Sequence, residues 1–173
     1  MAIVNIEFKA KANNIEILQE KLLTLNPIFV GEDHQIDTYY IVEKGRLKLR
    51  EGNIENALIW YERSDFAGAK QSDILLYKHL PDITLKQILE KLHGIMVVVD
   101  KKRKIYFVDN VKFHFDRVEG LGSFVEVEAI DKDGSIGIEK LKDQCDYYAA
   151  FFEISKEDFM EFSYSDMLVS SQR

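Results

Sequence analysis

The sequence predicts an antiparallel α+β domain, and the pattern of charge is the first observation behind that prediction. Charged and apolar residues alternate with a period of two over residues 5–11, 46–50 and 124–128. Because successive strand residues point to opposite faces, each stretch is a strand with one charged and one apolar face. Predicted helices lie between groups of predicted strands, and strands and helices do not alternate one by one as they do in a doubly wound fold. This order of elements favours an antiparallel sheet.

The predicted strands are runs rich in β-branched and aromatic residues with turn signals between them. In chain order they cover residues 3–11, 35–42, 46–50, 57–63, 73–78, 97–101, 105–117 and 124–130. The charged residues 102–104 are expected to form the turn between the sixth and seventh strands.

Apolar residues at helical spacing predict three helices and a short final one. They cover residues 15–26, 84–93 and 134–152, and the last begins at residues 155–158. In the second helix, Thr84 and Gln87 have the spacing of a capping box, and Gly94 stands where the helix should stop.

Composition limits the class of protein. The 173 residues suit one domain, 1–173, and no linker-like segment divides them. A net charge of -7 disfavours nucleic acid and anionic membranes as partners. Cys145 is the single cysteine, which excludes an internal disulfide and, with no secretory signal or membrane-spanning run, predicts a cytoplasmic protein.

The charged faces allow two interpretations. In an ordinary antiparallel sheet, the apolar face lies under helices and the charged face is in water. However, Arg46, Lys48 and Arg50 make one strand face wholly basic, while Glu126 and Glu128 make another acidic. A barrel with these faces inside would need a ligand that satisfies both signs, such as a phosphate chain with a divalent cation.

The motifs, taken in order, resemble those of the CYTH superfamily, the triphosphate tunnel enzymes, and within it the class IV adenylate cyclase-like branch. The matching fragments are residues 5–11, 35–40, 45–51, 61–63, 101–103, 114–122, 124–128 and 163–168. The resemblance implies an eight-stranded antiparallel β tunnel with a charged interior and helices packed outside.

The resemblance also implies the site residues. The implied ligands for Mg²⁺ or Mn²⁺ are Glu7, Glu126, Glu128 and Asp116. Asp116, as a ligand or proton acceptor, and Lys101 are the implied catalytic residues. The implied phosphate-binding residues are Lys9, Lys11, Arg46, Lys48, Arg50, Arg63, Lys78 and Arg103. The family's opening motif commonly starts with glutamate, and Asn5 stands there instead, which weakens the expectation of a second metal ion.

The expected activity is cyclisation of ATP to cyclic AMP and pyrophosphate. The alternatives are an inorganic, thiamine or nucleoside triphosphatase, or a non-catalytic nucleotide or polyphosphate binder. The expected partner is a small-molecule triphosphate, and the protein itself is expected to be a monomer or homodimer. Two simpler interpretations stand beside these: His114 as a hydrogen-bonded strand residue and Cys145 as a core residue. Four aromatic residues have two interpretations, as a stacking surface for adenine or as ordinary packing residues: Tyr39, Tyr40, Trp60 and Tyr61.

Overall fold

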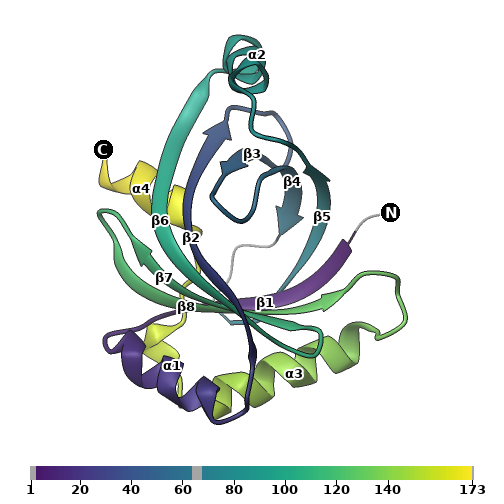
Figure 1. The fold of residues 1–173 in the computed structure, drawn as a ribbon, viewed down its shortest axis with the longest axis vertical. Helices are drawn as coiled ribbons and strands as arrows, with labels where there is room; N and C mark the ends of the chain where they lie inside the picture. The colour runs from purple at the N-terminus through teal and green to yellow at the C-terminus, as the bar shows by residue number, and fades with distance from the viewer. Residues whose placement is uncertain (1–2, 64–67, 173) are drawn as a thin grey trace.

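Eight antiparallel strands close into a barrel in the computed structural model, which describes residues 3–63 and 68–172. Figure 1 looks along this barrel. The strands are β1 (Ile3–Lys11), β2 (Ile28–Tyr40), β3 (Arg46–Glu51), β4 (Ala57–Arg63), β5 (Lys70–Lys78), β6 (Ile95–Val108), β7 (Val111–Val118) and β8 (Gly122–Asp131). Around the barrel their order is β1-β5-β4-β3-β2-β6-β7-β8, with β8 returning to β1. The predicted fold class is confirmed.

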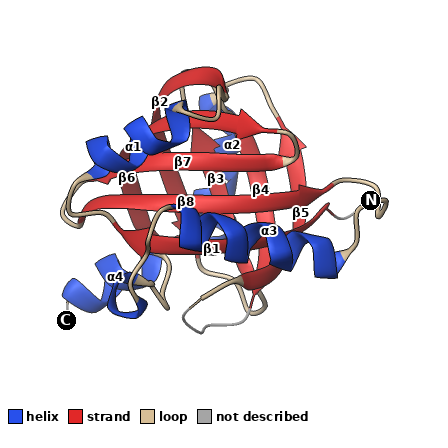
Figure 2. Cartoon of the chain, turned by 90° about the horizontal axis from the view of Figure 1, so that it is seen from below, coloured by secondary structure: helices blue, strands red, loops and turns tan. Residues whose placement is uncertain are grey.

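The helices lie outside the barrel. They are α1 (Ile15–Leu23), α2 (Ile83–His93), α3 (Ile138–Phe151), the 3₁₀ turn η1 (Lys156–Asp158) and α4 (Tyr164–Ser171). In Figure 1, α1 and α3 lie below the barrel, α2 above it and α4 beside it. Figure 2 shows α1 and α3 crossing the outer side of the sheet formed by β1, β7 and β8.

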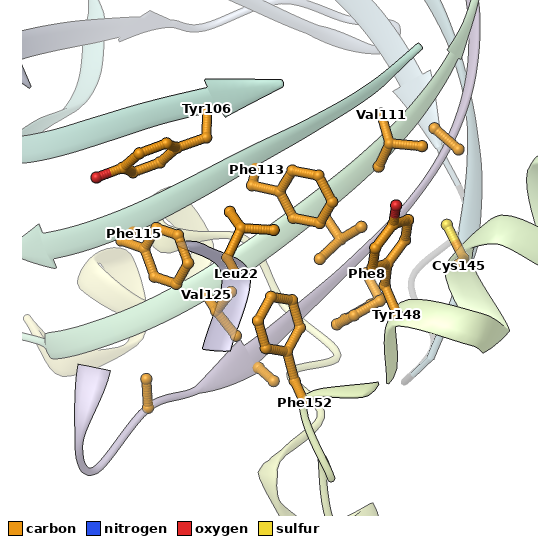
Figure 3. Close-up of a cluster of buried hydrophobic side chains, with 14 of the residues drawn as sticks. Phe8, Leu22, Tyr106, Val111, Phe113, Phe115, Val125, Cys145, Tyr148 and Phe152 are labelled. Atoms are coloured by element: carbon orange, nitrogen blue, oxygen red, sulfur yellow. The ribbon is translucent and has the colours of Figure 1, made fainter. Parts of the chain in front are cut away.

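The main core lies between this outer sheet face and the two helices. Phe8, Phe113 and Val125 point outward from the barrel and pack with Leu22 of α1 and Leu141 of α3, all at most 2% exposed. Cys145 belongs to the same cluster, drawn in Figure 3, and its buried thiol donates to a backbone carbonyl, so its predicted core role is confirmed. The apolar faces of the strands are thus covered, which turns their charged faces to the interior.

Strand β6 differs from the prediction. Residues 102–104 continue it without a turn, and the chain reverses instead at Asp109 and Asn110, inside the predicted strand 105–117. Asp109 has a φ of 50°, which suits a tight hairpin turn. The charged run is a strand because its two faces meet different surroundings: Lys101 and Arg103 are buried inside the barrel, whereas Lys102 is exposed outside.

Two further boundaries differ. Strand β2 begins at Ile28 and bends at Gly31, where its register with β6 shifts. Helix α2 is capped by Asp82, whose side chain accepts the Thr84 backbone N–H, so the capping box predicted at Thr84 and Gln87 is wrong. Asp82 is the N-cap because its carboxylate lies at the first backbone N–H groups of the helix, which have no partner within the helix.

The end of the chain also differs from expectation. Ser155 precedes only the 3₁₀ turn, and the last helix is α4, which the sequence interpretation missed. Ser163 and Asp166 form a complete capping box at its start. Within the part of the chain that the structure describes, no helix is both long and apolar enough to cross a membrane.

Candidate active site in the barrel interior

A cavity of about 580 Å³ occupies the interior of the barrel. Charged residues from β1, β2, β3, β6, β7 and β8 line one part of it. Strands β4 and β5 contribute an apolar wall, made of Ala57, Ile59, Tyr61, Ile74 and Leu76. A volume of this size lies in the range of small-molecule sites.

Three cations surround one carboxylate on the basic side of the cavity. Asp37 of β2 accepts hydrogen bonds from Lys48 Nζ at 3.1 Å, from Arg50 Nε and Nη2 at 2.8 Å each, and from Lys101 Nζ at 2.7 Å. Asp37 is 1% exposed and Lys101 is 2% exposed. Burial favours a neutral Asp37, but the surrounding cations outweigh it and hold the pKa of Asp37 well below its usual range.

This basic cluster, defined as Asp37, Lys48, Arg50 and Lys101, carries more positive than negative charge. Burial lowers the pKa of Lys101, and the neighbouring cations act in the same direction, although Asp37 opposes them. A buried excess of positive charge is costly unless an anion joins it. The cluster is therefore suited to phosphate groups, which Arg50 can bind with two donors.

The acidic side of the cavity lies on β7 and β8. One ligand atom each from His114, Glu126 and Glu128 lie within 4.8 Å of one another. The register pairs His114 with Glu126, while Glu7 of β1 stands opposite Glu128. Antiparallel pairing thus brings three strands' functional groups together. This ligand group is defined as His114, Glu126 and Glu128.

The protonation of the ligand group fits a divalent cation. Burial and nearby Arg103 lower the pKa of His114 to about 4, so its imidazole is neutral at pH 7. Burial and the charges of Glu7 and Glu126 raise the pKa of Glu128 to about 7. Burial also opposes ionisation of Glu126, but the charges of Lys9 and Arg103 outweigh it and keep that pKa well below normal.

An unsatisfied buried group supports the same conclusion. Neither ring nitrogen of His114, which is 1% exposed, has a hydrogen-bond partner among the described residues. Nδ1 lies 3.7 Å from Glu126 and 4.0 Å from Glu128. A neutral imidazole nitrogen beside two carboxylates is a donor set that binds Mn²⁺ or a similar divalent cation. The residues present therefore fit a metal ion.

Asp116 lies outside this ligand group. Arg103 donates Nε to Oδ1 at 2.7 Å and Nη2 to Oδ2 at 2.6 Å, and the Tyr164 hydroxyl donates to Oδ2 at 2.7 Å. Burial opposes ionisation of Asp116, but Arg103 outweighs it and lowers the pKa of the carboxyl. Arg103 also donates to Glu126 at 3.0 Å. Asp116 is thus placed as the counter-ion of Arg103.

The remaining predicted residues are divided between the cavity and other places. Lys9 and Lys78 line the cavity, and Lys9 Nζ lies 3.7 Å from the ring centroid of Tyr164. Arg46 instead donates to Asp166 of α4 at 2.9 Å, and Lys11 is exposed at the end of β1. Arg63 lies in β4, and its side chain is outside what the structure describes.

The sequence interpretation assigned no role to Asp37, Glu55 or Lys112, which also line the cavity, and it missed the apolar wall. Asp37 and Lys112 did carry a signal, since each alternates with other inward residues of its strand. Glu55 carried none, because it lies in a turn. Tyr39 and Tyr61 line the cavity, whereas Tyr40 packs outward with Leu49 and Leu89 under α2.

The comparisons with known proteins agree with this geometry. The model of the CYTH domain matches residues 4–158. A solved structure from Pyrococcus horikoshii has a TM-score of 0.81 and 25% identity, over 94% of this chain and 98% of the other. An adenylate cyclase candidate from Vibrio parahaemolyticus has a TM-score of 0.77 and 19% identity, over 95% and 97%. A cyclase candidate from Hippeastrum with a dominant triphosphatase activity has a TM-score of 0.63 and 14% identity, over 100% and 97%. No curated protein matches the sequence.

Proposed function

Since this chain belongs to the CYTH family, we propose that it is a metal-dependent enzyme acting on an organic triphosphate, with cyclisation of ATP as its first candidate reaction. One observation carries the proposal. The basic cluster and the ligand group face the same cavity as the apolar wall of β4 and β5. Phosphates, a divalent cation and an uncharged organic group therefore each have a matching surface.

The phosphate chain is assigned to the basic cluster, with Lys9 and Arg103 beside it. Positioning and charge neutralisation account for most catalysis of phosphoryl and nucleotidyl transfer. His114, Glu126 and Glu128, with Glu7 close by, would hold the metal ion. When bound, that ion would neutralise charge on the phosphates and orient them.

The organic group is assigned to the apolar wall. Ile59 is 7% exposed and Tyr61 is 8% exposed, and both face the cavity. An inorganic phosphate chain would leave this wall without a partner, while a base or another flat ring would cover it. In cyclisation the ribose 3′ oxygen bonds to the α-phosphorus, the bond to the bridging oxygen breaks, and pyrophosphate leaves. The hydroxyl proton must pass to an acceptor.

Hydrolysis is the second candidate, and the position of Asp116 favours it. Both oxygens of Asp116, the residue predicted to accept the ribose proton, are engaged by Arg103 and Tyr164. Cyclisation is thus without its expected acceptor. In hydrolysis, the oxygen of water bonds to the terminal phosphorus, the bond to the bridging oxygen breaks, and the diphosphate leaves while orthophosphate forms. This reaction requires no particular placement of a ribose.

A product assay tests the proposal. The protein is incubated with ATP, thiamine triphosphate or tripolyphosphate, each with Mg²⁺ and with Mn²⁺. Cyclic AMP with pyrophosphate supports cyclisation, and orthophosphate supports hydrolysis. Binding without turnover of any of the three contradicts an enzymatic role.

A variant of the apolar wall tests the organic substrate. We expect Ile59→Asn to reduce turnover of the organic triphosphates while turnover of tripolyphosphate persists. The exposed Ile17→Asn, outside the barrel on α1, serves as the control. Equal losses on all three substrates would contradict the assignment of the organic group to this wall.

A further inference from the structure

Glu55 is a charged residue of the cavity that the proposed reaction does not use. It lies in the turn between β3 and β4, and its side chain bonds Arg50 Nη1 of β3 at 3.2 Å and also Lys112 of β7. Strands β3 and β7 are not neighbours, because β2 and β6 lie between them in the barrel. The Glu55 carboxylate therefore bridges two separated walls at one end of the cavity.

The turn holds Glu55 in this position through a buried carboxylate. Asp33 of β2 is 0% exposed, and it accepts the backbone N–H groups of Ile54 and Glu55 at 2.9 Å each. Gln35 donates to both Asp33 at 2.8 Å and Glu55 at 3.1 Å. Fixed backbone and side-chain donors on both carboxylates preorganise the turn.

Close packing at Gly52 reinforces the arrangement. A Cβ atom there would lie 2.6 Å from Asp33 Oδ1 and 2.7 Å from the Glu55 carbonyl oxygen. Only glycine lets the turn approach Asp33 this closely. The hydrogen bonds to Asp33, the bond from Gln35 and the close packing at Gly52 together set the position of Glu55.

Arg50 marks the boundary between the basic cluster and Glu55. Its Nε and Nη2 face Asp37 inside the cavity, while its Nη1 faces Glu55 at the end. Burial disfavours the charged form of Glu55, but Lys112 and Arg50 outweigh it and hold its pKa well below normal. A phosphate that extends past Arg50 therefore meets the ionised carboxylate of Glu55. Lys112, the next cation, is already bonded to Glu55.

We infer that Glu55 is the anionic stop of the cavity: it excludes further phosphates beyond Arg50 and so selects a triphosphate over longer phosphate chains. The inference rests on the proposed function, since it requires the basic cluster to bind the phosphate chain. Glu55 acts as a specificity-determining residue, because repulsion of an extra phosphate discriminates between ligands that share every other contact.

Equilibrium binding of inorganic chains tests this role. Tripolyphosphate and tetrapolyphosphate are titrated separately by calorimetry, in EDTA so that neither is turned over. We expect the wild-type protein to prefer tripolyphosphate and Glu55→Gln to reduce that preference by about tenfold, the change that about 1.4 kcal/mol produces. Glu55→Asp, which keeps the charge, should retain most of the preference.

Glu51→Gln is the matched control, because Glu51 lies beside the same turn but bonds Lys86 of α2 at 2.8 Å. It should keep the wild-type preference, and equal melting temperatures establish that each variant is folded. An equal gain in affinity for both chains in Glu55→Gln would overturn the stop, since it would show only the release of two cations. Failure of wild-type protein to bind either chain would overturn the proposed function and this inference with it.

Discussion

Arg103 and Asp116 form a two-bond ion pair inside the barrel, with donor–acceptor distances of 2.7 and 2.6 Å. Asp116 is 0% exposed and Arg103 is 3% exposed. The pair also contacts the ligand group, because Arg103 donates to Glu126 at 3.0 Å. Its role is therefore as much structural as electrostatic.

Replacing Asp116 tests this structural role. Asp116→Asn leaves a buried guanidinium with only part of its compensation, so we expect the free energy of unfolding to fall by about 3 kcal/mol. Urea denaturation measures the change. The exposed Glu16, which pairs with Arg117 on the surface, supplies the control Glu16→Gln, for which no measurable change is expected. A loss no larger than that of the control would show that the buried pair is dispensable.

The depressed pKa of Asp37 predicts an acid-dependent stability. Its carboxyl stays ionised in the folded protein at pH values where the unfolded chain, with a pKa of about 3.9, binds a proton. Its contribution is therefore complete above about pH 5, and it is lost as the pH falls through about 3.9 toward the lower folded pKa.

The variant Asp37→Asn isolates this contribution. Unfolding free energies measured by urea at a series of pH values from about 2 to 6 should fall more steeply with acid in the wild-type protein than in the variant. The variant is expected to be less stable near neutral pH, since two buried cations, Arg50 and Lys101, and the half-buried Lys48 lose their counter-ion. Parallel pH profiles would contradict a depressed pKa at Asp37.

Lys101 and Lys102 are adjacent on β6 and provide a matched pair of variants. Lys101 is 2% exposed and faces Asp37, whereas Lys102 is exposed outside the barrel. Lys101→Met removes one charge-assisted phosphate donor, so affinity for ATP should fall by about tenfold, while affinity for adenosine changes little. Asp37 keeps Lys48 and Arg50 as partners, so the fold should persist. Calorimetric titration should give wild-type affinity in Lys102→Met; equal losses in the two variants would refute an interior phosphate site.

The sequence predicted the parts of the site that depend on strand periodicity alone. Lys9, Arg50 and Glu126 each alternate with apolar neighbours, and covering the apolar side with helices is enough to turn them inward. The run 101–104 shows the limit of this reasoning. Both of its faces are charged, so no apolar alternation distinguishes the strand from a turn.

Features that depend on cross-strand register or on turns could not be predicted. Asp37 acquires its role by standing opposite Arg50 on one side and near Lys101 on the other, which only the pairing of β2 with β3 and β6 determines. Asp116, predicted as a metal ligand or proton acceptor, forms an ion pair for a similar reason, because β6 places Arg103 directly opposite it. Tyr164 reaches Asp116 from α4, at the far end of the chain.

The ligand group makes the final prediction. Glu128→Gln removes one carboxylate donor, so binding of Mn²⁺ should weaken by at least about tenfold, and metal-dependent turnover should fall with it. The fold should persist, because the amide resembles the protonated form that Glu128, with a pKa of about 7, already populates. Calorimetric titration with Mn²⁺ measures the affinity. Glu119→Gln, in the exposed turn between β7 and β8, should bind Mn²⁺ as the wild-type protein does, and the same affinity in Glu128→Gln would remove Glu128 from the metal site.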